Sequence, residues 1–360
     1  MSARVQQLLS GAGPFDAITN QALAWQRILA ATGREGDVYA ATFDPRLDGA
    51  VRPAESLAGR VHDDDLLVIH YSAHASALEE AAALPNRKLL VYHNITPARY
   101  LWDHEPYVAM LCALGREGLR RLAGRVDGAI APSEFSARDL RDAGFPDVRV
   151  APAIYQFDRE RLRPGAGDET PYAGDGRRTI VFVGRLSHNK RQDRLVKALA
   201  LHQRHCDPEA RLVLPGSPGS GTYGEYLARL AVDAGARDVV LPGALPQPAL
   251  NALYARADVF CCLSEHEGFC IPLLEAMHFG LPVVAARAAA VPEVLGDAGV
   301  LLDDPDLPTV SEAIELCATS TALREELRTR GERRLAEFTP ERTEAAVREA
   351  IAAVEGGQTP

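Results

Sequence analysis

Short apolar runs alternate with helical stretches throughout the second half of the chain. This alternation restricts the possible folds more than any other feature of the sequence. Candidate strands fall at 179–183, 211–214, 239–241, 259–263, 281–285 and 299–302. Parallel strands need a long crossover between them, usually a helix, and such sheets are covered on both faces. The pattern therefore predicts a parallel sheet with helices on both sides.

The first half repeats the pattern less regularly. Candidate strands fall at 5–9, 37–41, 66–70, 88–92, 128–131 and 148–150, and helical stretches at 17–31, 75–83, 107–122 and 136–143. The segment 158–178 is rich in Pro, Gly and charged residues and lacks apolar periodicity, so it is interpreted as a linker. The chain of 360 residues then divides into domains at 1–157 and 179–338, followed by a helical segment at 339–360.

Charge and composition narrow the classes of function. A net charge of -10 argues against nucleic acid as the main partner. No apolar run approaches the ~20 residues that span a bilayer, and residues 5–9 are too short and polar for a signal peptide. A cytoplasmic location is therefore expected. The six cysteines show no zinc-type spacing, so buried, reduced thiols are expected.

The most informative segment runs from Ser264 to Glu275. It follows the apolar run 259–263, forms a polar turn and enters a helix with Pro272 in the first turn, where the N–H groups have no intrahelical partner. Free amides and the positive end of a helix suit a phosphate. Glu267 lies on the turn and Glu275 about one turn into the helix, so both are expected to face one crevice and accept hydrogen bonds from hydroxyls.

This segment resembles the Glu-x7-Glu motif of retaining glycosyltransferases of the GT-B fold, especially family 4. The resemblance continues through Gly280-Leu281-Pro282 and Val291-Pro292-Glu293 and is strongest over 179–303. It implies an α/β protein with two doubly wound, Rossmann-like domains facing a cleft and a C-terminal helix that crosses back onto the N-terminal domain. It also implies acceptor binding by the first domain and nucleotide-sugar binding by the second. The family's usual second Gly is Cys270 here.

A second motif, Gly184-Arg185-Leu186-Ser187-His188-Asn189-Lys190, follows one strand and precedes a helix. Gly184 permits a tight turn, and Arg185 and Lys190 supply two cations suited to a diphosphate. The loop is similar to the family 4 loop in which Arg and Lys hold the donor diphosphate. Considered alone, such basic residues are more often solvated, and the Glu267 segment is what favours the binding role.

Two positions in the first half are weaker candidates. His93 closes the strand 88–92 within a Tyr-His-Asn-Ile-Thr-Pro run similar to a subset of family 4, where a histidine of this region contacts the donor sugar. A structural histidine at a strand end is the alternative. Gly13 lies in the loop 10–16, where an ordinary tight turn competes with an approach to the donor phosphates.

The resemblance completes the expected site. Catalytic roles fall to Glu267, His93, Arg185 and Lys190. Donor contacts are expected from Gly13, Gly184, Arg185, Lys190, Gly216, Leu245, Glu267, Gly268, Phe269, Cys270, Ile271 and Glu275. No cofactor or metal is expected, since the aspartates at 63–65 and 303–306 are interpreted as solvated turns. A metal-binding face of His202, His205 and Cys206 is disfavoured against an exposed group without a ligand.

The expected reaction moves a hexose from a UDP- or GDP-linked sugar to a hydroxyl of a saccharide, glycolipid or small-molecule acceptor. A nucleotide-sugar 2-epimerase of the same architecture is the alternative, and a silent binding scaffold is a third. Weak membrane contact would involve the arginines at 116, 120, 121 and 125, for which a salt-bridged surface helix is the default interpretation. The sequence does not determine the oligomeric state.

Overall fold

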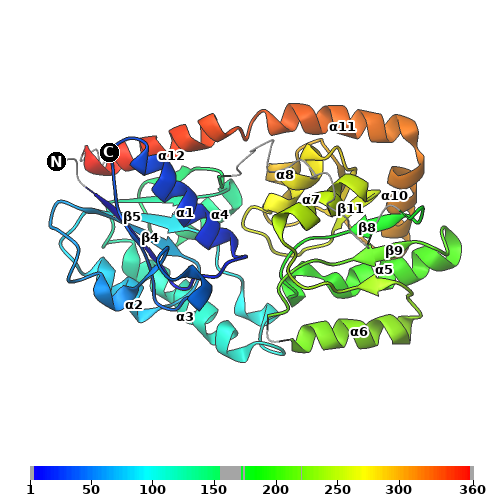
Figure 1. Ribbon diagram of the computed structural model, residues 1–360, viewed down its shortest axis with the longest axis horizontal. Coiled ribbons are helices and arrows are strands. Elements are labelled where there is room, and N and C mark those ends of the chain that lie inside the picture. Colours follow the sequence, from blue (N-terminus) through cyan, green and yellow to red (C-terminus); the bar gives the residue numbers. More distant parts are fainter. Residues whose placement is uncertain (1–3, 155–171, 173–174, 220, 357–360) are drawn as a thin grey trace. The chain divides into compact units, whose positions relative to one another are not determined.

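The computed structural model describes residues 4–154, 172, 175–219 and 221–356, and it divides into two compact units. Unit 1 comprises Met1–Trp102, Pro106–Ile154 and Pro340–Pro360, and unit 2 comprises Asp103–Glu105 and Tyr155–Thr339. The chain therefore re-enters unit 1 at its end (Figure 1). The predicted linker, 158–178, lies for the most part outside the described residues.

Unit 1 is built on a parallel sheet in which seven strands are described, in the order β3-β2-β1-β4-β5-β6-β7. Four of the predicted strands match the observed bounds, and β3 was missed because it is only two residues long. The strands are β1 (Val5–Leu9), β2 (Val38–Ala40), β3 (Arg52–Pro53), β4 (Leu66–Tyr71), β5 (Lys88–Tyr92), β6 (Gly128–Ala131) and β7 (Val148–Val150).

Helices cover both faces of this sheet, because successive residues of each buried strand point to opposite sides. In β4, Leu67 and Ile69 pack with α2 (Ser76–Ala82), α3 (Pro106–Leu122) and α4 (Glu134–Asp142). Leu66 and Val68 pack instead with α1 (Ala17–Ala30) and α12 (Pro340–Glu355). Two apolar layers thus enclose one sheet, as the absence of polar alternation in the strand predicts.

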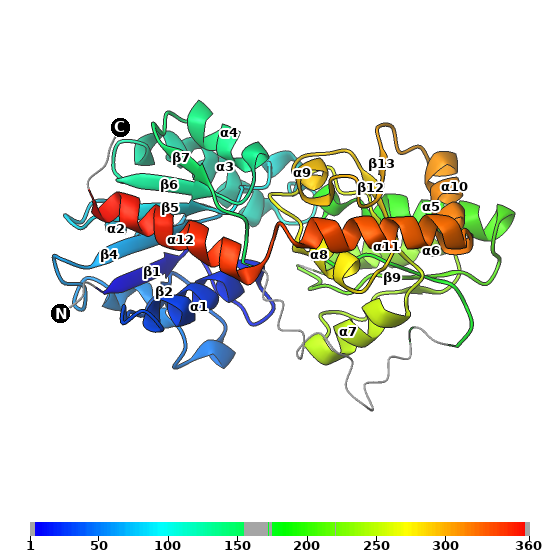
Figure 2. The same ribbon diagram turned by 90° about the horizontal axis from the view of Figure 1, so that it is seen from above.

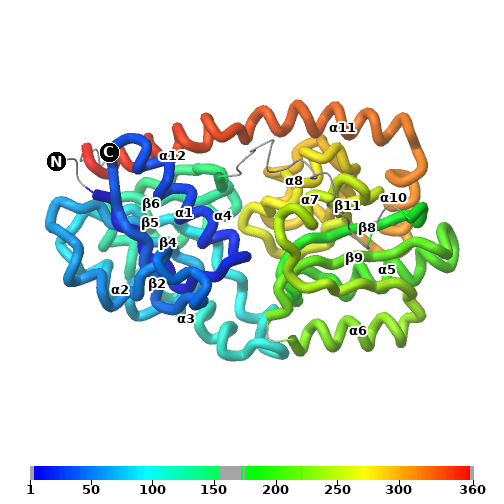
Figure 3. The backbone as a smooth tube through the Cα atoms, in the orientation of Figure 1, coloured from blue at the N-terminus to red at the C-terminus, as the bar shows by residue number. Residues whose placement is uncertain are grey.

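The final helix, α12, lies beside α1 over the strands of unit 1 (Figures 2 and 3). Its buried face consists of Val347, Ala350, Ile351 and Val354. Arg87 donates to the carbonyls of Val354 and Glu355 at 2.5 and 2.7 Å, so it satisfies groups that the helix leaves unpaired. The predicted return of the last helix to the N-terminal unit is confirmed.

Unit 2 contains a second parallel sheet, with six described strands in the order β10-β9-β8-β11-β12-β13. The loops that follow β8, β9, β10 and β11 leave the carboxyl edge of this sheet. The strands are β8 (Thr179–Val181), β9 (Arg211–Val213), β10 (Val239–Val240), β11 (Val259–Cys262), β12 (Val283–Ala286) and β13 (Val300–Leu302).

The helices of unit 2 complete the α/β alternation. They are α5 (Gln192–His205), α6 (Thr222–Ala234), α7 (Gln247–Arg256), α8 (Ile271–His278), α9 (Val291–Leu295), α10 (Leu307–Thr319) and α11 (Thr321–Leu335). The helices α9 to α11 had no sequence prediction. The predicted fold class, with two doubly wound α/β sheets of GT-B type, is confirmed by the two parallel sheets.

Candidate functional site

Three loops at the carboxyl edge of unit 2 are joined by backbone hydrogen bonds. The N–H of Gly184 donates to Pro215 O at 3.0 Å, and that of Gly216 donates to Gly243 O at 2.9 Å. The loops approach so closely that a Cβ on Gly216 would lie 1.9 Å from the carbonyl oxygen of Gly184. Backbone packing therefore requires glycine at position 216. This structural role is separate from the donor contact that the sequence predicts for Gly216.

The loop after β8 is also fixed to the turn after β11. Asn189 accepts at its carbonyl from Glu265 N–H at 2.8 Å and donates its amide to His266 O at 3.0 Å. Asn189 is buried, and sequence reasoning gave it no role. Its position beside Lys190 in a loop was the available signal. These bonds hold Lys190 against the turn that carries Glu267.

Lys190 and Glu267 form an ion pair with 2.5 Å between Nζ and Oε2. Their side chains are only 21% and 7% exposed. Burial acts against the charged ammonium, but the charge of Glu267 and its hydrogen bond raise the pKa of Lys190 overall. A buried pair of this kind is costly to break by removing one partner, because the other charge is left uncompensated. The two predicted catalytic residues therefore lie in direct contact.

Helix α8 starts beside this pair. Cys270, the residue before the helix, has φ 76° and ψ 65°, a left-handed conformation that favours glycine. No side chain among the described residues caps the helix, Pro272 has no N–H, and Leu273 N–H donates to the carbonyl of Cys270 at 3.1 Å. The start of α8 therefore presents the positive end of the helix dipole next to Lys190.

Cys270 also meets a second thiol. Ligand atoms of Cys262, Glu267 and Cys270, all buried, lie within 4.8 Å of one another. A hydrogen bond with Cys262, together with burial, holds the pKa of Cys270 well above its ordinary value, so the thiol stays neutral. Glu267 is already paired with Lys190, and we assign this group to packing of the site.

Glu275 contacts a different partner. Tyr254 of α7 donates its hydroxyl to Glu275 Oε2 at 2.8 Å. Burial raises the pKa of Glu275 to about 7, although the bond from Tyr254 favours the ionised form. The carboxyl group therefore titrates near neutrality, which the sequence did not predict. Glu267 and Glu275 belong to one motif but have different partners. Glu267 pairs with Lys190, whereas Glu275 accepts from Tyr254 and has a raised pKa.

Arg185 does not share the partner of Lys190. Its guanidinium pairs with Glu105 Oε2 at 2.9 Å, and Glu105 is the better buried of the two. Glu105 lies within the short segment Asp103–Glu105, which belongs to unit 2. Its carboxylate also lies close to Gly219. Sequence reasoning missed Glu105, because 80 residues separate it from Arg185.

The other predicted donor contacts lie around the same loops. Phe269 is buried and packs edge-on against Phe338, with ring centroids 5.7 Å apart, so it has a core role. Gly268, Ile271 and Leu245 are half-buried, and Leu245 follows β10. Contact of these three residues with the donor stays a prediction.

His93 belongs to a hydrogen-bonded chain in unit 1. Its Nε2 lies 2.9 Å from His70 Nδ1, and His70 Nε2 lies 2.9 Å from Gln7 Oε1. The amide nitrogen of Gln7 donates to Ala22 O at 2.9 Å, which fixes Oε1 toward His70. His70 Nε2 is therefore the donor, its Nδ1 accepts from His93, and Nδ1 of His93 is left as an acceptor.

Burial keeps this chain uncharged. It lowers the pKa of His93 to about 3 and that of His70 well below its ordinary value. His93 is thus a neutral imidazole at the end of β5, able to accept a hydrogen bond from a hydroxyl. His70 and Gln7 were missed. Polar residues within buried strands were the signal that could have found them.

Gly13 is engaged within its own turn. Its N–H donates to Thr19 Oγ1 at 3.0 Å, and Asp16 accepts from Thr19 N–H as the N-cap of α1. This geometry is that of the tight turn that the sequence left as an alternative. An approach of Gly13 to phosphate stays a prediction.

The predicted basic helix is α3. Arg116 pairs with Asp139 at 3.2 Å and Arg121 with Glu79 at 2.8 Å, as the salt-bridged interpretation expects. Tyr107, Met110 and Leu114 are exposed on the same helix. Among the described residues, no helix has both the length and the apolar character needed to cross a bilayer.

The cysteines and the disfavoured metal face need one correction. Five cysteines are buried and free, as expected, but Cys206 is exposed. His202, in contrast, was expected among exposed residues and is 1% exposed, because α10 covers it. His202 and Cys206 meet Glu315 of α10, whereas His205 does not belong to this group.

Comparison with known proteins finds a family match in the C-terminal part of the chain. The family model described as "Glycosyl transferases group 1" matches residues 171–334, which include Arg185, Lys190, Glu267 and Glu275. Residues 171–334 are therefore similar to the group 1 glycosyl transferases. The match covers the loops at the carboxyl edge of unit 2, so the family resemblance and the clustered side chains coincide.

Similar proteins include mannosyltransferases of mycobacteria. The chain is 31% identical over 225 residues to a GDP-mannose-dependent alpha-(1-6)-phosphatidylinositol monomannoside mannosyltransferase of Mycolicibacterium smegmatis, covering 59% of this chain and 58% of that protein. It is 30% identical over 258 residues to the MMP alpha-(1->4)-mannosyltransferase of Mycolicibacterium hassiacum, covering 69% and 60%. The matches thus span less than two thirds of these relatives.

Solved structures share the fold over nearly the whole chain. Anabaena HepE in complex with UDP-glucose superposes with a TM-score of 0.77 at 18% identity, covering 97% of this chain and 99% of that one. The sucrose-phosphate synthase of Thermosynechococcus elongatus gives 0.76 at 18% identity, covering 99% and 100%. At this identity the likeness establishes the fold alone.

Proposed function

We propose that this protein is a glycosyltransferase that moves a hexosyl group from a nucleotide diphosphate sugar to a hydroxyl of an acceptor. The observation that carries the proposal is the buried Lys190–Glu267 pair beside the start of α8, within the segment that matches the glycosyl transferase family. A cation, a carboxylate and free helix amides are the groups that a diphosphate and a sugar require.

In this proposal, donor binding changes the hydrogen-bond partners of Lys190, Glu267 and Arg185. The diphosphate accepts hydrogen bonds from Lys190 and from the amides at the start of α8, and Glu267 is released from Lys190 to accept from sugar hydroxyls. Arg185 supplies a second cation after leaving Glu105. Positive charge on these groups stabilises the departing nucleotide diphosphate, and its worth rises where water is excluded. We propose that no metal ion is needed and that the configuration of the sugar is retained, as the family 4 resemblance implies.

GDP-mannose is the donor that we favour. The relatives at 31–32% identity include GDP-mannose-dependent mannosyltransferases of Mycolicibacterium smegmatis and Mycobacterium tuberculosis and a D-inositol 3-phosphate glycosyltransferase of Salinispora arenicola. The structure of HepE contains UDP-glucose but is more distant in sequence. The guanine base would bind the loops after β9 and β10, near Gly216 and Leu245, and the ribose would bind Glu275.

Calorimetric titration with GDP-mannose and UDP-glucose tests the donor site. The double variant Arg185→Ala/Lys190→Ala should lose measurable donor binding, since each charge-assisted hydrogen bond is worth about 1.5–3 kcal/mol. The matched control is Arg204→Ala/Lys197→Ala, which removes the same two residue types from exposed positions on α5. Unchanged donor affinity in the first variant would refute the site.

Product analysis separates transfer from isomerisation. The proposed enzyme should consume the donor rapidly only when an acceptor is present. Conversion of UDP-N-acetylglucosamine to an epimer without any acceptor would support the epimerase interpretation instead. Binding without turnover of the donor across an acceptor panel, with and without lipid, would point to a scaffold.

We further propose that unit 1 recognises the acceptor. His93 Nδ1 can accept a hydrogen bond from an acceptor hydroxyl, and α3 exposes Tyr107, Met110, Leu114 and Arg120. Apolar and basic groups on one helix suit a lipid-linked acceptor at an anionic surface. Sedimentation with phosphatidylinositol-containing vesicles should decrease in Met110→Ser/Leu114→Ser. Equal sedimentation of both proteins would remove the membrane part of the proposal.

A further inference from the structure

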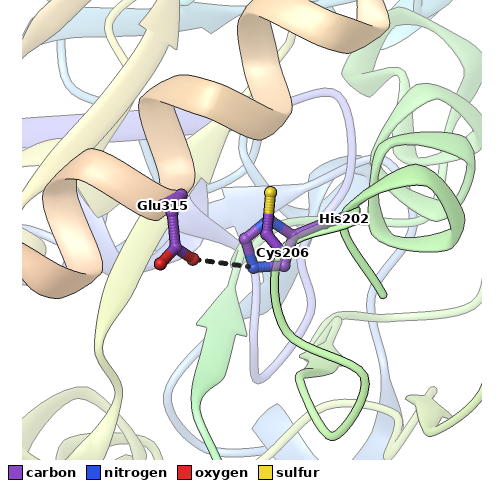
Figure 4. A group of neighbouring side chains, drawn as sticks. All are labelled: His202, Cys206 and Glu315. Atoms are coloured by element: carbon purple, nitrogen blue, oxygen red, sulfur yellow. Dashed lines mark ion pairs between the residues drawn. The ribbon is translucent and has the colours of Figure 1, made fainter. Parts of the chain in front are cut away.

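Two helices of unit 2 carry matched pairs of polar residues away from the proposed donor site. His202 and Cys206 are four residues apart at the end of α5, and Ser311 and Glu315 are four residues apart on α10. Residues with this spacing lie on one helical face. The turn at Cys206 is held in place, because its N–H donates to His202 O at 2.8 Å. Figure 4 shows the side chains of His202, Cys206 and Glu315 gathered in one place.

Their separations suit a shared ligand. One atom from each of the three side chains lies within 4.8 Å of the others. His202 Nε2 and Glu315 Oε2 are 3.7 Å apart, which exceeds an ordinary hydrogen bond. Two ligands of a tetrahedral zinc ion with bonds of ~2.0–2.1 Å are about 3.3 Å apart. Small side-chain movements would therefore complete the coordination distances.

The state of His202 favours coordination over an ion pair. Burial lowers the pKa of the imidazole, so the neutral form that binds metals prevails at neutral pH. Nδ1 lies 3.3 Å from Ser311 Oγ. Donation of the Nδ1 proton to Ser311 leaves the Nε2 lone pair directed toward Glu315. A metal-bound histidine usually has such an outer hydrogen bond at its second nitrogen.

Other charged groups surround the three ligands. Arg178 contacts both oxygens of Glu315, at 3.2 and 3.0 Å, and its Nε lies 3.7 Å from Asp207. The guanidinium therefore competes with a metal for Glu315, while Asp207 offsets its charge. This competition should give the site a moderate affinity.

We propose that His202, Cys206 and Glu315 form a binding site for a zinc-type divalent ion that links α5 to α10. Nitrogen, sulfur and oxygen donors together suit zinc, and three protein ligands leave a fourth position for water on the exposed side of Cys206. Binding forms a metal–sulfur bond and releases the thiol proton to solvent. The ion holds the two helices together and takes no part in the proposed transfer reaction, on which this inference does not depend.

Cobalt(II) is the probe, because its bond to a thiolate gives a near-ultraviolet charge-transfer band. The full-length chain, stripped with a chelator, should develop this band on addition of cobalt chloride, and zinc should abolish it. Cys206→Ser should lose the band, and Glu315→Gln should bind cobalt more weakly. Ser311→Ala should reduce affinity about 10–100-fold, as outer partners of metal-bound histidines do.

Two controls make the assignment falsifiable. His205→Ala removes an exposed neighbouring imidazole and should leave the cobalt titration unchanged. The second group of potential ligands, at Cys262, Glu267 and Cys270, is tested with Cys262→Ser. A band that survives in Cys206→Ser, or that disappears only in Cys262→Ser, would overturn the site. No band in the unmodified protein at millimolar cobalt would overturn it as well.

Discussion

Glu275 provides the sharpest test of the electrostatics of unit 2. Its pKa in the folded protein is about 7, against an ordinary value of 4.5, because the carboxyl group is buried. The folded protein therefore holds this proton more tightly than the unfolded chain does. The resulting stability is fully present below pH 4.5 and is lost as pH rises to about 7.

The magnitude follows from the two pKa values. At about 1.4 kcal/mol per pKa unit, the difference between 4.5 and about 7 corresponds to about 3 kcal/mol of unfolding free energy. Glu275→Gln removes the ionisation but keeps an oxygen that accepts from Tyr254. The variant should be more stable than the unmodified protein by about this amount at pH 8, and the two should be equal near pH 4.5.

The assay must report on unit 2. Both tryptophans, Trp25 and Trp102, belong to unit 1, so their fluorescence does not follow α8. Urea unfolding should be monitored by far-ultraviolet circular dichroism at several pH values, with tryptophan emission as the separate record of unit 1. Glu312→Gln, at an exposed position on α10, is the matched control and should change nothing.

A parallel pH profile for Glu275→Gln and the unmodified protein would refute the reasoning, because the loss of stability would then come from another group. Tyr254→Phe gives a second check with the opposite sign. The Tyr254 bond favours the ionised carboxylate, so its removal should raise the pKa of Glu275 further and steepen the loss of stability.

Three further predictions concern packing. Gly216→Ala should lower the unfolding midpoint and abolish donor binding together, because its methyl group would meet backbone 1.9 Å away; a midpoint within error of the parent would contradict this. Gln7→Leu should cost about 1–3 kcal/mol by leaving the buried His70 N–H without its acceptor, measured by urea unfolding. Gly128→Ala should reduce hydrogen-exchange protection in α12, since Val354 lies 2.7 Å from the added methyl, and Val354→Ala should restore it.

Much of the secondary structure follows from local sequence. Most strands are short segments rich in apolar residues and bounded by turn residues, so β1, β5, β6 and β7 could be located to the residue. Helix starts were less accurate. Ser133 accepts from Ser136 N–H and starts α4 at Glu134, two residues before the predicted start, because the capping bond precedes the first apolar residue of the helix.

Reasoning from the local sequence predicted only part of the candidate site. Lys190 and Glu267 were selected because each belongs to a short motif with a recognisable purpose. The sequence did not predict the 2.5 Å contact between these two side chains. It also did not predict the pairing of Arg185 with Glu105 or the raised pKa of Glu275. Motifs report the chemistry of a segment, but burial and pairing depend on what the fold brings against that segment.

The sequence by itself determined the alternation of strands and helices, and hence two parallel α/β sheets, because periodicity and turn residues act over a few neighbouring positions. Only the tertiary structure decided which polar groups meet. Gln7 and His70 come from two strands and His93 follows a third, and His202 and Glu315 come from two helices. Contacts between distant segments arise from the packing of whole layers, and no local pattern encodes them.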